Sequence, residues 1–209
     1  MRTAAAISGL YAITDAALQP PERLVDAVAA AVDGGARVIQ YRDKGDDDAR
    51  RLEQALALAA LCRDRGVTFL VNDDIRLAAE AQADGVHLGR DDEALAAARR
   101  ELGDRAVIGV SCYNELHRAL DAEAAGASYV AFGSVFPSRV KPHAPRAELA
   151  LLRRARQRLR VPIVAIGGVD ADNAGLAVAA GADAVAVISA VFASTDVAAA
   201  ARRVAAVFE

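Results

Sequence analysis

The sequence predicts a (β/α)8 TIM barrel, a closed ring of parallel strands that each lead into a helix, in a single domain over residues 1–209. Two observations predict it. Eight short β-branched runs alternate with longer Ala- and Leu-rich amphipathic runs along the whole chain. Polar residues gather where the β-branched runs end, which is the functional rim of such barrels. Periodicity cannot show that a sheet closes, so a doubly wound open sheet remains the alternative.

The predicted strands are too uniformly apolar to alternate, as expected of parallel strands that are buried on both faces. They cover residues 9–14, 38–41, 68–71, 86–88, 107–110, 129–132, 163–166 and 184–188. Between them, apolar residues recur every three or four positions, which is typical of amphipathic helices. Two such stripes are Leu24, Val28 and Val32, and Val197, Ala201, Val204 and Phe208.

Glycines and capping residues mark the helix ends. The glycines that we expect to close helices just before strands are Gly34, Gly35, Gly66, Gly85, Gly126 and Gly181. Asp172 and Thr195 follow predicted strands, and both residue types are favoured at helix starts. The order of these signals agrees with a strand-then-helix repeat throughout the chain.

Composition argues against several classes of function. The chain is 54% hydrophobic and carries a formal net charge of −3, with charges of both signs scattered, which disfavours a nucleic-acid surface. Tryptophan is absent and aromatic residues make up 4%, so platforms for stacking bases are few. No apolar run reaches the roughly 18 residues that span a membrane, and no secretory signal is evident. Cys62 and Cys112 form no CxxC pair, so we expect a cytoplasmic, reducing location.

The end of the second predicted strand is strongly cationic. Gln40, Arg42 and Lys44 are spaced by two, so on a strand they would share one face and project toward the barrel mouth. Two cations and an amide on one face favour a phosphate clamp, because Arg offers a forked, charge-assisted grip. The alternative is a set of internal salt bridges between these cations and nearby aspartates.

Carboxylates end the third and fourth predicted strands. Asn72-Asp73 and Asp91-Asp92 follow neighbouring strands, so their side chains can converge. Oxygen ligands on rigid strand ends suit Mg²⁺, which keeps several waters and is usually shared with substrate phosphates. The alternative makes these aspartates helix N-caps. Both can hold, with one carboxylate of a pair capping a helix while its neighbour binds the metal.

Further polar features lie on the later strands. Gly168 ends the seventh predicted strand and Ser189 follows the eighth, where barrels of this kind hold phosphate on backbone amides. Residues 134–145 form a loop that is long for this chain, and we interpret it as a lid that brings Lys141 onto the leaving phosphates. We expect His87 to be a hydrogen-bonded core histidine and His117 to be an exposed helix residue.

With these motifs in place, the chain resembles the thiamine-phosphate synthase family. The matching segments occur in family order on all eight strands: QYRDK (40–44), VNDD (71–74), GVHLGRDD (85–92), IGVSCYN (108–114), YVAFGSVFPS with Lys141 (129–141), PIVAIGGV (162–169) and AVAVISA (184–190). The resemblance implies an enzyme that joins hydroxymethylpyrimidine pyrophosphate to thiazole phosphate, giving thiamine phosphate and pyrophosphate. Its partners would be these small molecules, with neither nucleic acid nor membrane.

The resemblance also implies the role of each site residue. The pyrimidine pyrophosphate would lie on Gln40, Arg42, Lys44, Asn72, Ser111 and Lys141, of which Arg42, Lys44, Ser111 and Lys141 would be catalytic. Tyr41 and Asp43 of the same motif would also bind substrate. The cofactor Mg²⁺ (Mg2+) would bind Asp73 and Asp92. The thiazole phosphate would lie on Ser138, Arg139, Val140, Gly168, Ile188 and Ser189. A dissociative substitution fits this set, because it needs a neutralised leaving group more than a strong base.

Two positions depart from the family pattern. Val140 replaces a common hydroxyl residue before the lid lysine, and Arg90 replaces a common glutamine. The rival activities are a thiazole tautomerase of a related barrel family and a non-catalytic thiamine-phosphate-binding protein. Tautomerase relatives are expected to carry a histidine two residues after the Ser111 position, where this chain has Tyr113. The oligomeric state stays open, because the apolar outer face of a barrel can hide a homo-oligomer interface.

Overall fold

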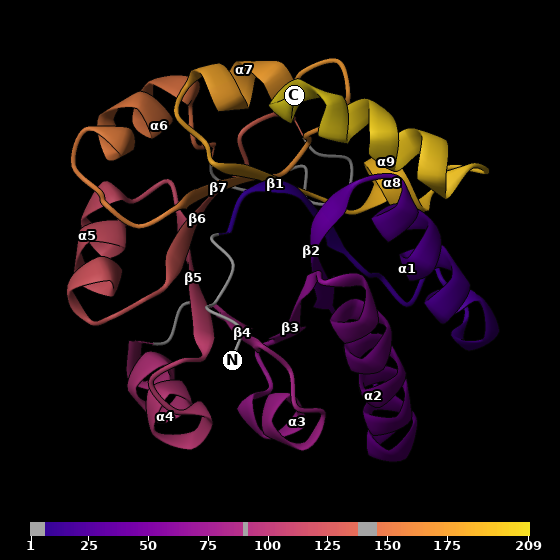
Figure 1. Cartoon of the computed structure of the whole chain (residues 1–209). Coiled ribbons are helices and arrows are strands. Elements are labelled where there is room, and N and C mark those ends of the chain that lie inside the picture. The colour runs from indigo at the N-terminus through magenta and orange to yellow at the C-terminus, as the bar shows by residue number, and fades with distance from the viewer. Residues whose placement is uncertain (1–6, 90–91, 138–145) are drawn as a thin grey trace.

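The strands close into a barrel. The computed structural model describes residues 7–89, 92–137 and 146–209, with side chains given for all of these except 92 and 93. The strand order is β1 through β8, and β1 pairs in parallel with both β2 and β8. Figure 1 shows the strands in a central ring with the helices around the outside. The single (β/α)8 barrel is therefore confirmed, and the open-sheet alternative is wrong.

The strands follow the apolar runs, with small shifts at their ends. They are β1 (Gly9–Ile13), β2 (Ala36–Tyr41), β3 (Thr68–Asn72), β4 (Gly85–Leu88), β5 (Val107–Tyr113), β6 (Tyr129–Gly133), β7 (Ile163–Ile166) and β8 (Ala184–Val187). Strand β5 runs three residues beyond the predicted stretch 107–110, through Ser111, Cys112 and Tyr113, of which Cys112 is buried in the core. Strand β2 ends at Tyr41, before the cations that follow it.

The helices occupy the predicted amphipathic runs. They are α1 (Leu24–Asp33), α2 (Asp48–Arg65), α3 (Ile75–Glu80), α4 (Asp92–Leu102), α5 (Leu116–Ala124), α6 (Leu149–Arg156), α7 (Ala174–Ala179), α8 (Ser189–Phe192) and α9 (Val197–Ala205), with 3-10 turns at Pro21–Arg23 and Ala206–Phe208. Leu24 and Val28 are buried as their stripe predicts. No helix in the described part of the chain combines the length and apolarity that crossing a membrane requires.

Three of the capping predictions are wrong. Asn173, not Asp172, stands directly before the first residue of α7. Gly66 ends α2 in the left-handed conformation, as predicted. Gly85, however, begins β4, and a Cβ there would lie 1.8 Å from the Val107 carbonyl oxygen. Glycine is needed at this position so that β4 and β5 can approach closely. Asp196, not Thr195, caps α9 by accepting a hydrogen bond from the Ala199 amide. The longer reach of the Asp carboxylate at the first non-helical position explains that one-residue shift.

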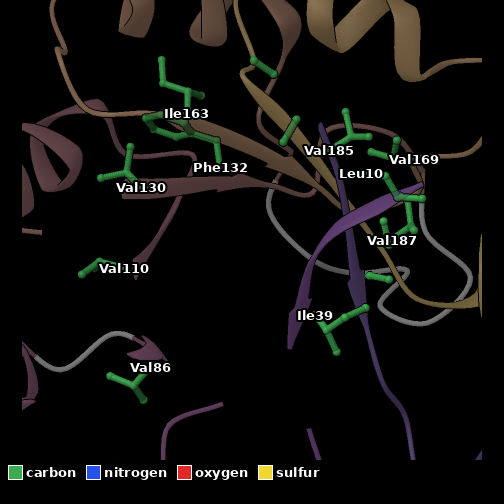
Figure 2. Packing of buried hydrophobic residues seen from close by; sticks show 14 of the residues in the cluster. Leu10, Ile39, Val86, Val110, Val130, Phe132, Ile163, Val169, Val185 and Val187 are labelled. Atoms are coloured by element: carbon green, nitrogen blue, oxygen red, sulfur yellow. The ribbon is translucent and has the colours of Figure 1, made fainter. Parts of the chain in front are cut away.

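Two apolar layers hold the barrel together. The larger lies between the strands and the helices, and Figure 2 shows part of it, including Leu10 of β1 and its register partner Val185 of β8. The smaller fills the barrel interior and contains Ile7, Tyr11, Ile13, Val38, Leu70, Val107, Tyr129, Ala131, Val164, Ala184 and Ala186. Two tyrosines therefore stand among the apolar side chains of the interior.

Candidate functional site

The carboxyl ends of all eight parallel strands meet at one rim, so the polar residues that end them share it. The pairing register places Asn72 of β3 beside His87 of β4, and His87 beside Gly109 of β5. Gly109 in turn pairs with Tyr129 of β6. A continuous row across four strands therefore carries an amide, an imidazole and a phenol.

The two cations after β2 are placed differently from one another. Arg42 lies just past the strand, where its backbone N–H donates to Thr14 Oγ1 at 2.9 Å. Its Nη1 is 3.4 Å from Asp15 Oδ2, and both side chains keep about a quarter of their surface exposed (24% and 22%). A close charge-assisted hydrogen bond is typically about 2.7–2.9 Å, so this pair is loose. Lys44 is exposed, and the described residues provide no ion pair for it.

Strand alternation does not extend to Lys44. Because β2 ends at Tyr41, the spacing-by-two argument places Gln40 inward but fixes no direction for Lys44. Gln40 is 2% exposed, and its amide bonds within the barrel to Tyr11 and Asn72. The shared face predicted for Gln40, Arg42 and Lys44 is therefore wrong as a strand feature.

Two residues of the same segment face α2 with their side chains. The Tyr41 hydroxyl donates to Gln54 Oε1 at 2.8 Å, outside the barrel. Asp43 Oδ2 accepts from Arg50 Nη2 at 3.0 Å, and Asp43 Oδ1 accepts from the Gly45 amide at 2.7 Å. Both side chains are therefore engaged by α2 and the loop that leads into it. The salt-bridge alternative is not met by Asp43, whose cation is Arg50, whereas Arg42 pairs at 3.4 Å with Asp15.

The two aspartates after β3 are placed differently. Asp74 caps α3 by accepting from the Leu77 amide at 2.9 Å, and it pairs with Arg51 at 2.7 Å. Asp73 has a φ of +61°, a left-handed conformation that costs a non-glycine residue on the order of 1 kcal/mol. This turn exposes the Asp73 carboxylate, of which Oδ2 accepts from Asn72 Nδ2 at 2.7 Å. Asp74 is therefore the helix cap after β3, and metal binding by Asp73 stays a prediction.

The Asp73 carboxylate faces the segment that leads toward Asp92. Its Oδ1 lies 3.6 Å from where a Cβ on Gly89 would stand. The Asp92 backbone begins α4, and its side chain lies outside the described residues. Within the described set no three His, Cys, Asp or Glu side chains form a metal-binding cluster. The hard oxygen of Asp73, exposed at the rim, fits a cation such as Mg²⁺ that completes its shell with water and substrate oxygens.

Buried polar side chains continue from Asn72 across the barrel interior. The Tyr11 hydroxyl is 2.7 Å from Gln40 Oε1 and 2.8 Å from the Tyr129 hydroxyl. His87 Nδ1 is 2.8 Å from the Tyr129 hydroxyl, and His87 Nε2 is 2.9 Å from Ser111 Oγ. Burial lowers the pKa of His87 from 6.5 to about 4, so the ring is neutral at physiological pH. The prediction of a hydrogen-bonded core histidine is confirmed.

Ser111 occupies the rim end of this polar chain. It lies on β5, half-buried, with the His87 ring beneath it. His117, by contrast, is exposed on α5 as predicted, with 74% of its side chain accessible. Ser111 is therefore the described hydroxyl that joins the interior network to the barrel mouth.

The glycines after β7 have a structural role. Gly167 and Gly168 have φ values of +93° and +67°. A Cβ on Gly168 would lie 2.4 Å from the Pro137 carbonyl oxygen, and one on Gly167 would lie 2.3 Å from Ser134 Oγ. Glycine here lets residues 134–137 pack over the end of β7, where the Phe136 amide donates to the Gly167 carbonyl at 2.9 Å. Ile188 and Ser189 follow β8, the neighbour of β7, and Ser189 begins α8.

The predicted lid spans residues that are only partly described. Ser138, Arg139, Val140 and Lys141 lie outside the described residues, as does Arg90. The segment is held at its base, because the Ala147 amide donates to the Ser134 carbonyl at 2.9 Å and Arg146 Nη2 reaches the Val135 carbonyl at 3.3 Å.

Sequence reasoning missed Tyr11, Tyr129, Gly109 and Asp15. Both tyrosines lie within predicted strands, but apolar strands give no parity that shows which side chains point inward. A Cβ on Gly109 would lie 2.0 Å from Tyr129 Cζ, so Gly109 makes room for that ring. A glycine inside a predicted strand was the available signal, since it often marks a close approach.

Comparisons with known proteins all identify the same family. The family model described as thiamine monophosphate synthase matches residues 10–191. A thiamine-phosphate synthase from Chromobacterium violaceum is 58% identical over 199 residues, covering 95% of each chain. One from Methylococcus capsulatus is 54% identical over 200 residues, covering 96% of this chain and 89% of its own. The solved thiamine phosphate pyrophosphorylase from Pyrococcus furiosus superposes with a TM-score of 0.86 at 37% identity, covering 95% and 94% of the two chains.

Proposed function

Because the chain belongs to the thiamine monophosphate synthase family and is a transferase, we propose that it joins hydroxymethylpyrimidine pyrophosphate to thiazole phosphate. The products would be thiamine phosphate and pyrophosphate. The observation that carries the proposal is 54–58% identity to thiamine-phosphate synthases over at least 95% of this chain. The rim supports it with a loosely paired arginine, an exposed lysine and an exposed carboxylate.

The pyrophosphate group would lie on the cations of the rim. Arg42 is held only at 3.4 Å by Asp15, so its guanidinium can turn to a phosphate with little lost. Lys44 is exposed on the same loop, and Lys141 of the segment 138–145 would add a third positive charge. Asn72 and Ser111 would complete the contacts of the pyrimidine substrate, since both reach the mouth from buried partners.

Asp73 and Asp92 would hold Mg²⁺ beside the pyrophosphate. Asp73 supplies an exposed carboxylate whose second oxygen faces the segment toward Asp92. When bound, the ion would help to neutralise the charge of the leaving group, as divalent cations do for phosphoryl oxygens. The thiazole phosphate would lie across the mouth on Ser138, Arg139, Val140, Gly168, Ile188 and Ser189.

The residues suit a dissociative substitution. The bond between the pyrimidine methylene carbon and the pyrophosphate oxygen would break, with both electrons leaving on pyrophosphate. The thiazole nitrogen would then donate its lone pair to the resulting carbon cation, forming the new C–N bond. This route needs no general base at the rim, which agrees with a His87 ring that is neutral and engaged at both nitrogens. Arg42, Lys44 and Lys141 would stabilise the departing charge.

The test is a pyrophosphate-release assay with both substrates. We expect release with Mg²⁺ that requires both substrates and stops when a chelator removes the metal. A tautomerase or a non-catalytic binding protein would release no pyrophosphate under any of these conditions. Release that continues unchanged with chelator would leave the synthase activity standing and overturn the proposed metal requirement.

A further inference from the structure

Seven polar side chains form one unbroken hydrogen-bond chain through the barrel. Its order from one side of the mouth to the other is Asp73, Asn72, Gln40, Tyr11, Tyr129, His87 and Ser111, with donor–acceptor distances between 2.7 and 2.9 Å at every link. Six strands, β1 through β6, each contribute one member, and Asp73 directly follows β3. The chain joins the proposed metal ligand to the proposed substrate-binding serine.

The carboxylate of Asp73 fixes the direction of the first links. Asn72 donates through Nδ2 to Asp73 Oδ2 at 2.7 Å, which leaves its carbonyl oxygen to accept from Gln40. Gln40 must then donate through Nε2 to Asn72, which turns its own carbonyl oxygen toward Tyr11. Tyr11 therefore donates its one hydroxyl hydrogen to Gln40.

The remaining links follow in the same direction. Tyr11 can only accept from Tyr129, so the Tyr129 hydrogen points to Tyr11. Tyr129 must then accept from His87, which places a proton on His87 Nδ1. Burial raises the pKa of Tyr11 and Tyr129, so both phenols keep their hydrogens. With the ring neutral, His87 Nε2 carries a lone pair, and Ser111 must donate to it.

We propose that Tyr11, Tyr129 and His87 are positioning residues that hold the Ser111 hydrogen on His87, so that Ser111 presents lone pairs to the barrel mouth. Ser111 then accepts a hydrogen bond from an N–H of the pyrimidine ring system and does not bind the pyrophosphate, whose oxygens also only accept. This inference rests on the proposed function for its substrate. The direction of the hydrogen-bond chain rests on the geometry alone.

The direction can be tested without substrate by ¹⁵N NMR of the histidine rings. His87→Gln identifies the His87 signals among the three histidines. We expect a protonated Nδ1 and a bare Nε2 in the parent protein. A protonated Nε2 overturns the proposal. Tyr11→Phe removes the link that orients Tyr129, so it should produce the other His87 tautomer or a mixture of the two. If Tyr11→Phe folds poorly, Tyr129→Phe is the second variant, with the same expected result.

Tyr41→Phe is the matched control for the NMR measurement. It also removes a buried tyrosine hydroxyl, but one that bonds to Gln54 outside the barrel. The His87 tautomer should be unchanged in this variant. A tautomer that shifts equally in Tyr41→Phe and Tyr11→Phe would mean that general loosening sets it, which contradicts the proposal.

The contact of Ser111 is tested with inorganic pyrophosphate as an inhibitor. Ser111→Ala should raise KM for the pyrimidine substrate about tenfold, the size of one lost hydrogen bond, and leave the inhibition constant of pyrophosphate within about twofold. Arg42→Ala should weaken pyrophosphate inhibition. If Ser111→Ala weakens it as much, Ser111 binds the leaving group and the proposal fails.

A double-mutant cycle tests whether Tyr11 acts through Ser111. Tyr11→Phe should lower kcat/KM about tenfold in the parent but less than about twofold in the Ser111→Ala background, because coupled residues are not additive. Additive losses would overturn the positioning role. Failure of the proposed function would appear separately, as an absence of pyrophosphate release in the parent protein with a His87 tautomer that is still as expected.

Discussion

Tyr11 and Tyr129 meet inside the barrel with their hydroxyl oxygens 2.8 Å apart, although 118 residues separate them in the chain. Their rings pack edge to face, with centroids 6.1 Å apart, in the geometry that aromatic pairs prefer. Closure of the barrel lets β1 and β6, which do not pair with each other, face one shared interior. Two phenols at that level give an apolar core the hydrogen-bond partners that connect one side of the rim to the other.

Gly109→Ala should destabilise the protein, because the new Cβ would stand 2.0 Å from Tyr129 Cζ. Overpacking of this kind costs about 1–3 kcal/mol, and the displaced ring should also break the contact to His87. The measurement is the free energy of unfolding in urea. The control is Gly175→Ala on α7, where a Cβ has no heavy atom within 4 Å and should stabilise the helix by about 0.5–1 kcal/mol. Equal effects of the two substitutions would contradict the packing.

Asp73→Asn should raise the Mg²⁺ concentration needed for half-maximal activity at least about tenfold, because a charged ligand becomes a neutral one. Asparagine keeps the left-handed backbone and the oxygen that accepts from Asn72, so stability should change little. The comparison is Asp74→Ala, which removes the α3 cap and the Arg51 pair. That variant should lose about 1–2 kcal/mol of stability with an unchanged Mg²⁺ requirement. An unchanged Mg²⁺ titration for Asp73→Asn would remove it from the metal site.

His87 should make the protein less stable in mild acid. Its folded pKa is lowered to about 4 by burial, against 6.5 in the unfolded chain, so the unfolded state binds a proton first as the pH falls. This contribution is absent above pH 6.5, grows as the pH falls from 6.5 to about 4, and reaches about 3 kcal/mol in order of magnitude. His87→Gln should lack it, whereas the exposed His117→Gln should keep the parent's profile. Identical urea-unfolding profiles for the parent and His87→Gln would contradict the neutral buried ring.

Lys141→Ala should depress turnover more than it weakens thiazole phosphate binding. The reason is that its proposed contact is with the leaving pyrophosphate, whose charge grows as the bond breaks. Steady-state kinetics with each substrate varied in turn provide the measurement. Turnover equal to that of the parent would place Lys141 away from the reacting bond.

Most of the architecture could be predicted, because buried parallel strands and amphipathic helices leave different periodicities. Closure could not, since no local pattern states that β1 pairs with β8. Gly85 was predicted as a helix end because glycine serves both left-handed caps and close strand contacts, and only packing against Val107 separates them. Thr195 and Asp196 are both residue types that cap helices, and sequence patterns place a helix start only to within one or two residues.

The sequence indicates which polar residues follow each strand, but it does not show whether their side chains point into the barrel mouth or toward a neighbouring helix. Asp74 rather than Asp73 caps α3 because the helix start requires a cap one residue after a sharp turn, a choice that the strand-end pattern alone left open. Tyr41 and Asp43 differ from expectation because their side chains bond to Gln54 and Arg50 of α2. These partners are not part of the strand-end motif, but they lie next to it in space. The interior chain through Tyr11 and Tyr129 depends on contacts between distant strands, which one sequence does not reveal.

A crystal structure of this protein with Mg²⁺ and pyrophosphate bound tests the proposed site most directly. We expect a metal about 2.1 Å from a carboxylate oxygen of Asp73 and shared with Asp92 and pyrophosphate. We also expect Arg42 on the pyrophosphate and Ser111 still donating to His87. A pyrophosphate that binds elsewhere, or a metal that leaves Asp73 free while Arg42 stays on Asp15, would contradict this arrangement.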